Sequence, residues 1–253
     1  VIDAENVTRR RGITIQGSSS ATTTVQALTV QRGKVTDASA GGGGIYAQTG
    51  NVALKSLRVL SNLAAGEDKG RHGGGIYLGT GRYLIRDTVV QGNNATESGG
   101  GIYLEGGEYL IHNTLVQENQ ASEYGGGIYM SGDRAVVSNS MFSGNSSFGG
   151  CGVHAVGYVM LTVSEGIFSE KTDCRGQGLY AGGAPDSETH LYDNIFRHNQ
   201  NGGARVAYSG VPAYVRQKLF ASRNLFLENN ASHCGGLQVS VANVSLQDNV
   251  FSG

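Results

Sequence analysis

Tyrosines recur at a regular spacing along the chain, and they are the first residues that suggest a binding function. Each follows an isoleucine or leucine directly, and the series consists of Tyr46, Tyr77, Tyr103, Tyr129 and Tyr180, with His154 at the equivalent place before Tyr180. Columns of aromatic rings can stack on sugar rings or pack against a partner protein. The alternative is structural: stacked rings stabilise the sheet that carries them, or a loop or terminal segment covers them.

Charged residues recur at a similar spacing and could bind ions or polar ligands. They form two series, with Arg82, Glu108 and Arg134 in one and Arg71, Glu97 and Glu123 in the other. Opposite charges on adjacent strands attract, whereas two stacked carboxylates repel unless solvent or a bound cation neutralises them. For Glu97 and Glu123 we expect a solvated pair, with a shared cation as the alternative.

Catalytic groups are sparse. A glycoside hydrolase needs two carboxylates at a defined separation, and no acidic pair recurs on one face with a basic partner. The histidines lack the spacing of metal ligands, so we expect no metal and no cofactor. Arg86 and His112 are the remaining catalytic candidates because they share one outward column, although residues in such a place are usually plain surface.

These residues are positioned by an internal repeat of about 26 residues. One anchor is a pair of glycines followed by an apolar residue, as at Ile76, Ile102 and Ile128. The second anchor is an apolar residue with asparagine three positions later. That asparagine series is Asn62, Asn93, Asn119, Asn145, Asn199 and Asn229. The repeats are most regular over residues 73–145.

Each repeat reads as strands and turns. The segment "GIYL" alternates in polarity, and "YLIRDTVVQ" is rich in β-branched and aromatic residues with a bend expected near Asp87 or Asn113. A unit of about three short strands cannot bury its own apolar face, so copies must stack in register. The pattern predicts an all-β, single-stranded parallel β-helix of eight to nine turns, on the order of 40 Å long. Inward asparagines at one corner would form a hydrogen-bonded ladder.

The repeated "GGGI" and apolar-X-X-Asn motifs resemble those of the chlamydial polymorphic outer membrane proteins and of pectate-lyase-like β-helices. The resemblance covers roughly residues 24–253, and the chain departs from it by using Gly where that family often has Ala and Val at three early Phe positions. It implies a right-handed β-helix and a secreted or surface-displayed protein, often adhesive. The shared residues belong to the scaffold and identify no ligand.

Composition and cysteine content limit the classes of protein to which the chain could belong. A net charge of −1 gives no reason to expect nucleic-acid binding, and no apolar run is long enough to span a bilayer. Cys151 and Cys174 lie almost one repeat apart, so they either pair across neighbouring turns or remain separate buried thiols. We expect residues 1–253 to form a single β-helix domain. Neither end of the sequence carries a clear capping segment, so the end strands would expose unpaired backbone groups. We therefore expect either that the domain is part of a longer chain or that it associates end to end.

We therefore expect an extracellular or cell-surface β-helix without catalytic activity, serving as an adhesin, stalk or filament subunit. Its partners would be a glycan or a surface protein on a lateral face. The alternative is a polysaccharide-active enzyme, a lyase or glycoside hydrolase, whose groove is built from the insertions at 182–190 and 207–218. Insertions in repeat folds loop out on one face and often carry recognition.

Overall fold

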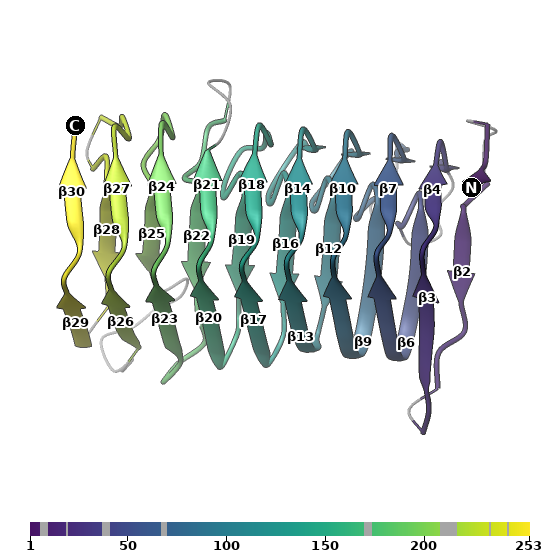
Figure 1. Cartoon of the computed structure of the whole chain (residues 1–253), viewed down its shortest axis with the longest axis horizontal. Coiled ribbons are helices and arrows are strands. Elements are labelled where there is room, and N and C mark those ends of the chain that lie inside the picture. The colour runs from purple at the N-terminus through teal and green to yellow at the C-terminus, as the bar shows by residue number, and fades with distance from the viewer. Residues whose placement is uncertain are drawn as a thin grey trace.

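Short apolar runs separated by glycine and polar turns stack into a rod, which the computed structural model shows as parallel strands repeated along one axis (Figure 1). It describes residues 1–5, 10–18, 20–36, 41–66, 70–169, 174–207, 217–232, 234–241 and 243–253. The fold is an all-β solenoid of about nine turns with roughly 26 residues per turn, which confirms the predicted architecture. The two ends of the chain lie at opposite ends of the rod (Figure 1). The described residues contain no helix, and hence none long and apolar enough to cross a membrane.

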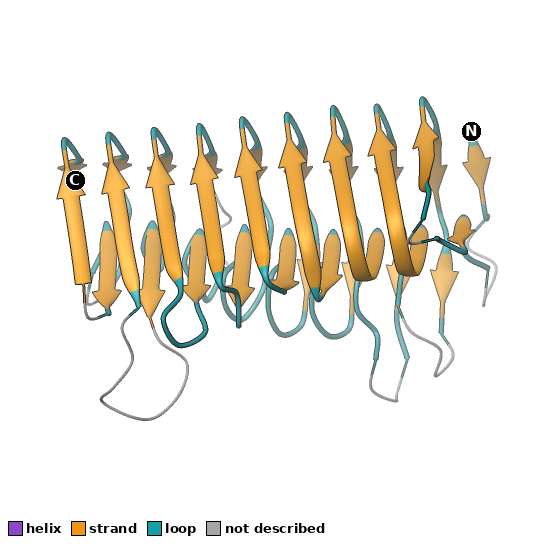
Figure 2. Ribbon diagram, turned by 90° about the horizontal axis from the view of Figure 1, so that it is seen from below, coloured by secondary structure: helices purple, strands orange, loops and turns teal. Residues whose placement is uncertain are grey.

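The strands of the described residues belong to three sheets, each running the length of several turns (Figure 2). The ten-stranded sheet contains β1 (Ile2–Asp3), β4 (Thr29–Gln31), β7 (Arg58–Leu60), β10 (Val89–Gln91), β14 (Leu115–Gln117), β18 (Met141–Ser143), β21 (Ile167–Ser169), β24 (Ile195–Arg197), β27 (Leu225–Leu227) and β30 (Val250–Ser252). The four-stranded sheet contains β5 (Lys34–Val35), β8 (Leu63–Ala64), β11 (Asn94–Ala95) and β15 (Gln120–Ala121).

The third sheet has 16 strands and supplies two strand segments to most turns. Its first segments are β2 (Ile13–Ile15), β12 (Ile102–Glu105), β16 (Ile128–Ser131), β19 (Val153–Val156), β22 (Leu179–Gly182), β25 (Ala204–Ala207) and β28 (Leu237–Ser240). Its second segments are β3 (Thr22–Gln26), β13 (Gly107–His112), β17 (Arg134–Ser138), β20 (Met160–Ser164), β23 (Glu188–Tyr192), β26 (Lys218–Ser222) and β29 (Asn243–Gln247). The long strands β6 (Ile45–Lys55) and β9 (Ile76–Arg86) run through both segments.

Backbone conformation explains where the chain bends. Gly107 opens β13 with a φ of +113°, a value that glycine adopts without steric cost. The next corner is made by Asp87 and Asn113, whose φ values of 53° and 48° lie in the left-handed region. Asp and Asn tolerate that region better than other side chains, and both residues lie where the sequence predicts a bend.

Equivalent apolar residues lie directly above one another inside the rod. Ile76, Ile102 and Ile128 are neighbours in the register of successive strands and are fully buried, which confirms the predicted ladder. A second interior column begins with valines and changes to phenylalanine at Phe142. From there the rings of Phe142, Phe168, Phe196, Phe226 and Phe251 stack, with centroids 4.7 to 4.9 Å apart.

The predicted asparagine residues form a hydrogen-bonded ladder at one corner, all of them buried except the partly buried Asn229. Asn93 is representative: its Nδ2 donates to the carbonyl of Val59 at 3.0 Å and to Oδ1 of Asn119 at 2.9 Å. Its own Oδ1 accepts from the backbone N–H and the Nδ2 of Asn62, both at 2.9 Å. Each amide therefore satisfies backbone groups of the preceding turn and bonds to the asparagine amides of the turns before and after it, as buried polar groups require.

A second ladder, which the repeat motifs did not predict, lies at another corner of the last turns. Asn194, Asn224 and Asn249 repeat the same bonding, with Nδ2 of Asn224 donating to Leu191 O at 2.8 Å and to Asn249 Oδ1 at 2.9 Å. Earlier turns place hydroxyl side chains at this corner, including Thr114, whose Oγ1 donates to the carbonyl of His112 at 3.0 Å.

Cysteines and the last turn complete the scaffold. Cys151 and Cys174 are joined in a disulfide across neighbouring turns, with their Cα atoms 6.0 Å apart, and Cys234 is a free, partly buried thiol. In the last turn, Leu246 and Phe251 are about half exposed. End-to-end self-association stays a prediction.

Candidate functional site

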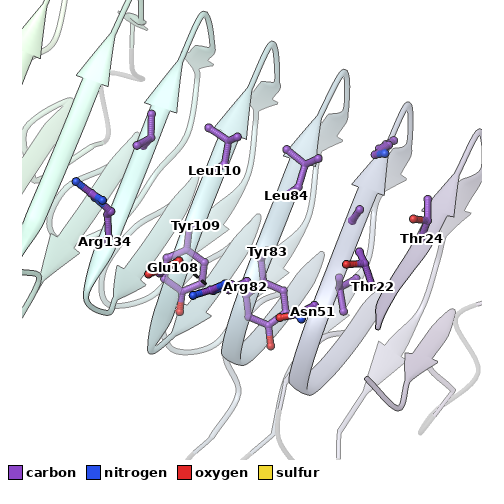
Figure 3. A pocket seen from close by; sticks show the side chains of 14 residues that line it. Thr22, Thr24, Asn51, Arg82, Tyr83, Leu84, Glu108, Tyr109, Leu110 and Arg134 are labelled. Carbon is purple, nitrogen blue, oxygen red and sulfur yellow. Dashed lines mark ion pairs between the residues drawn. The ribbon is translucent and has the colours of Figure 1, made fainter. Parts of the chain in front are cut away.

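A lateral groove crosses the outer face of the second segments of the 16-stranded sheet. Figure 3 shows the side chains that line it. The groove spans β3, β6, β9, β13 and β17, and its volume is about 750 Å³. Because residues alternate between the interior and the surface along a strand, every second residue of these strands faces the groove. The outward residues fall into rows that run along the rod, one residue per turn.

One row is charged and the next is aliphatic. In the charged row, Nε of Arg82 lies 3.2 Å from Oε2 of Glu108, and both side chains are more than half exposed (Figure 3). The predicted attraction between these two residues of opposite charge in one column is therefore present. Arg134 continues the row, with its Nη2 3.0 Å from the sulfur of Met160.

The aliphatic row consists of Leu84, Leu110 and Val136, of which Leu110 is 44% exposed. No site was predicted at this row from the repeat motifs. Its signal was available, since apolar side chains stand at outward positions in three consecutive repeats, between columns of charged residues.

Two tyrosines line the inner end of the groove without offering acid–base chemistry. The rings of Tyr83 and Tyr109 are buried and stack on each other with centroids 5.8 Å apart. Their hydroxyls donate to the carbonyls of Thr80 and Gly106. Burial raises the pKa of Tyr83 to about 12, so its hydroxyl stays protonated near neutral pH.

Arg86 and His112 lie beside the groove, in register on β9 and β13. Nε of Arg86 is 2.9 Å from Oδ2 of Asp87, and Nδ1 of His112 is 3.0 Å from Oγ of Ser138. Hydrogen bonds from Asn113 and Arg86 hold the pKa of Asp87 below its ordinary value. Arg86 and Asn113 thus bond to Asp87, while His112 bonds separately to Ser138. The single carboxylate in these contacts is not the opposed pair that glycoside hydrolysis uses.

The tyrosine column lies on the outer face of the first segments of the same sheet. Ring centroids are 5.1 Å apart between Tyr46 and Tyr77, 5.3 Å between Tyr77 and Tyr103, and 4.9 Å between Tyr103 and Tyr129. Interplanar angles of 22° or less mean that each ring places its faces against its neighbours. The column therefore presents ring edges, whereas sugar stacking needs a free ring face.

Neighbouring side chains cover the column further. The ring of His72 stacks on Tyr103 with centroids 4.2 Å apart, and the hydroxyl of Tyr77 donates to the carboxylate of Glu105. Burial and this carboxylate raise the pKa of Tyr77 well above its usual range. At the two ends, the guanidinium of Arg11 lies 4.5 Å from the centroid of Tyr46 and that of Arg205 lies 5.8 Å from Tyr180. These contacts support the structural interpretation, and ligand binding by the column stays a prediction.

The two stacked glutamates have protein partners. Oε2 of Glu97 is 3.0 Å from Nε2 of His72 and accepts from the N–H of Gly70, while Glu123 accepts from Oγ of Ser98 at 3.4 Å. Arg71 is fully buried, with Nε and Nη1 lacking hydrogen-bond partners. Across the part of the chain that the structure describes, no group of three or more His, Cys, Asp and Glu residues could hold a metal ion.

The insertion at 182–190 forms the end of β22 and most of β23, whereas residues 208–216 of the second insertion lie outside the described residues.

Comparison with known proteins gives one result: the family model described as the right-handed beta helix region matches residues 43–251. This match confirms the handedness that the repeat motifs implied. No curated protein matches the chain, and no solved structure does.

Proposed function

This chain belongs to the right-handed β-helix family, and from that premise we propose that it is a non-catalytic extracellular or cell-surface protein that binds a linear polysaccharide in its lateral groove. The observation that carries the proposal is the groove itself, about 750 Å³ across five neighbouring strands. Within each row the residues repeat once per turn, about 4.8 Å apart. That spacing is comparable to the length of one sugar unit, so successive sugars would meet equivalent side chains.

The groove offers the two kinds of contact that sugars need. The aliphatic row of Leu84, Leu110 and Val136 suits the C–H faces of the rings, and the flanking Arg82 and Arg134 can donate hydrogen bonds to hydroxyl oxygens. These side chains stand on rigid, paired strands, which limits the ordering entropy lost on binding.

Surface display is supported by two further features. The disulfide between Cys151 and Cys174 is of a kind that persists in oxidising, extracellular compartments. The "GGGI" and apolar-X-X-Asn motifs resemble those of the chlamydial polymorphic outer membrane proteins, many of which are adhesive. An adhesin or stalk that holds a glycan along its side combines these properties.

The proposal is tested by affinity electrophoresis in gels containing hydroxyethyl cellulose, mannan or polygalacturonate. We expect at least one polymer to retard the protein, and Leu110→Asp to abolish the retardation. Thr162→Asp is the matched control, because Thr162 follows Val136 in the same row but does not line the groove. Equal retardation of both variants, or none with any polymer for the wild type, would refute groove binding.

A polysaccharide-active enzyme is the second candidate, favoured by a network where the two insertions end. Nδ1 of His190 is 2.6 Å from the hydroxyl of Tyr192, and its Nε2 is 3.3 Å from Oε2 of Glu188. Nζ of Lys218 lies 2.9 Å from Oε1 of Glu188. Such a chain could move a proton to or from a bound sugar. New reducing ends or unsaturated products that vanish in His190→Ala would establish the enzyme and overturn the non-catalytic proposal.

A further inference from the structure

A second recess lies on a different face from the groove, outside the first segments of the 16-stranded sheet near β19, β22 and β25. Its volume is about 430 Å³, within the ~300–1,000 Å³ range of ligand sites. The residues of its lining that matter here are Tyr124, Phe148, His154, Arg175, Tyr180 and Arg205. They combine aromatic rings with two arginines.

The aromatic part of the recess keeps open surface, unlike the tyrosine column. Phe148 is 59% exposed and Tyr124 is 39% exposed. Their rings meet edge to face, with centroids 6.3 Å apart and an interplanar angle of 78°. The ring of Tyr124 also contacts the ring of His154, with centroids 4.7 Å apart. The two exposed rings therefore form a notch that fits an apolar side chain better than a flat sugar ring.

The charge in the recess is positive. Neither Arg175 nor Arg205 forms an ion pair with a described acidic residue, and Nε of Arg205 is buried without a hydrogen-bond partner. Burial lowers the pKa of His154 to about 4, so this imidazole is neutral near pH 7. The two guanidinium groups thus supply the charge, and a carboxylate is the group that their planar donors match best.

Covalent and backbone contacts fix the recess. The disulfide links Cys151, which follows Phe148 by three residues, to Cys174, which precedes Arg175. The backbone N–H of Arg175 donates to Ser147 O at 3.1 Å. Because the arginine and the exposed aromatic rings are held together before any ligand arrives, binding would lose little ordering entropy.

We propose that this recess binds an acidic segment of a partner protein. A carboxylate side chain would lie between Arg175 and Arg205, and a neighbouring apolar side chain would enter the notch of Phe148 and Tyr124. Tyrosine and arginine are the residues that most often dominate protein interfaces, and here two exposed aromatic rings and two arginines without acidic partners converge in one preformed depression. The site is independent of the polysaccharide groove.

The test is selection of a random peptide library displayed on phage against the immobilised protein, followed by fluorescence anisotropy with the synthesised consensus peptide. We expect peptides that carry Asp or Glu within two positions of an apolar residue. The double variant Arg175→Gln/Arg205→Gln and the single variant Phe148→Ser should each weaken the peptide at least tenfold, which corresponds to about 1.4 kcal/mol. Circular dichroism checks that both variants fold, and Arg205→Lys should retain part of the affinity.

Other outcomes decide against the proposal or separate it from the groove. Leu110→Asp should leave peptide affinity unchanged, and Arg175→Gln should leave retardation by polysaccharide unchanged. Peptides without acidic residues, equal affinity for the arginine double variant, or no enrichment at all would overturn the proposal. A glycan array that shows only carboxylate-bearing sugars binding through Arg175 and Arg205 would overturn it in favour of a sugar site.

Discussion

The early and late turns of the rod share one backbone path but fill it with different side chains. In the early turns the interior column holds Val90 and Val116, whereas Phe168 and Phe196 stack in the late turns with centroids 4.7 Å apart. Both sets are fully buried. Register therefore matters more than the identity of the residue, because any apolar side chain of tolerable size continues the column.

The second corner differs in the same way. Thr114 contributes one hydroxyl hydrogen bond within its own turn, while Asn224 bonds to the turn before it and the turn after it. In the interior column and at this corner, the late turns therefore have ring stacking and amide–amide hydrogen bonds that the valine and threonine turns lack.

The largest expected effect tests the interior column. Phe168→Ala removes a ring that lies between two others and should lower the free energy of unfolding by about 4 kcal/mol, against about 2 kcal/mol for Val116→Ala. Equilibrium urea denaturation followed by circular dichroism measures both. Equal losses would show that stacking in the late turns adds nothing to burial.

The next largest change in stability is expected at the second corner, the one occupied by Thr114 and Asn224. Asn224→Ala leaves buried backbone and amide groups without partners and should cost about 3 kcal/mol, whereas Thr114→Ala should cost about 1 kcal/mol. Asn94→Ala, at an exposed position, is the control and should change stability by less than about 0.5 kcal/mol. If Thr114→Ala were the more damaging change, the late ladder would not be the stronger corner.

Acid should act on His154, where the aromatic column passes from the early turns to the late ones. Its pKa in the folded state is about 4, lower than in the unfolded chain, so the unfolded state takes up the proton first as pH falls. Stability should fall between about pH 6.5 and about pH 4, by about 2 kcal/mol from pH 7 to pH 5. His154→Tyr, which matches its neighbours Tyr129 and Tyr180, should remove this contribution. Identical pH profiles of the two proteins in urea denaturation would contradict the assignment.

The smallest expected change in stability comes from replacing a valine of the early interior column by the phenylalanine that the late turns have. Val116→Phe adds volume to a packed column but lets the new ring stack on Phe142, so the net loss should be about 1 kcal/mol. Thermal denaturation compares this variant with the wild type. A clear gain in stability would mean that the early turns are underpacked.

Sequence periodicity predicted the scaffold well, because stacking in register leaves equivalent residues little freedom. The Ile76 column, the Asn93 ladder and the bend at Asp87 all follow from spacing alone. The second ladder was missed because Asn194 and Asn224 occupy a place where earlier repeats have Leu, Thr, Ser or Gly, so no common residue marks it. The recess could not be predicted because it depends on exposure and on how side chains of several turns combine. The aliphatic row of the groove did leave a signal, outward apolar residues in three consecutive repeats, which was not recognised as a site. The tyrosines were correctly predicted to lie on the outer face, but their spacing could not show that the rings would stack face to face and leave only their edges exposed.

The unbroken register of the regular turns has a further consequence. Residues 73–98 and 99–124 pair strand for strand, so each begins and ends at the same point of the coil. A duplication or loss of one such unit would leave no hydrogen bond unmatched and would change the height of the molecule by a single increment of about 4.8 Å. Duplication of whole coils can therefore lengthen such a protein during evolution without any change to the sequence of the existing coils.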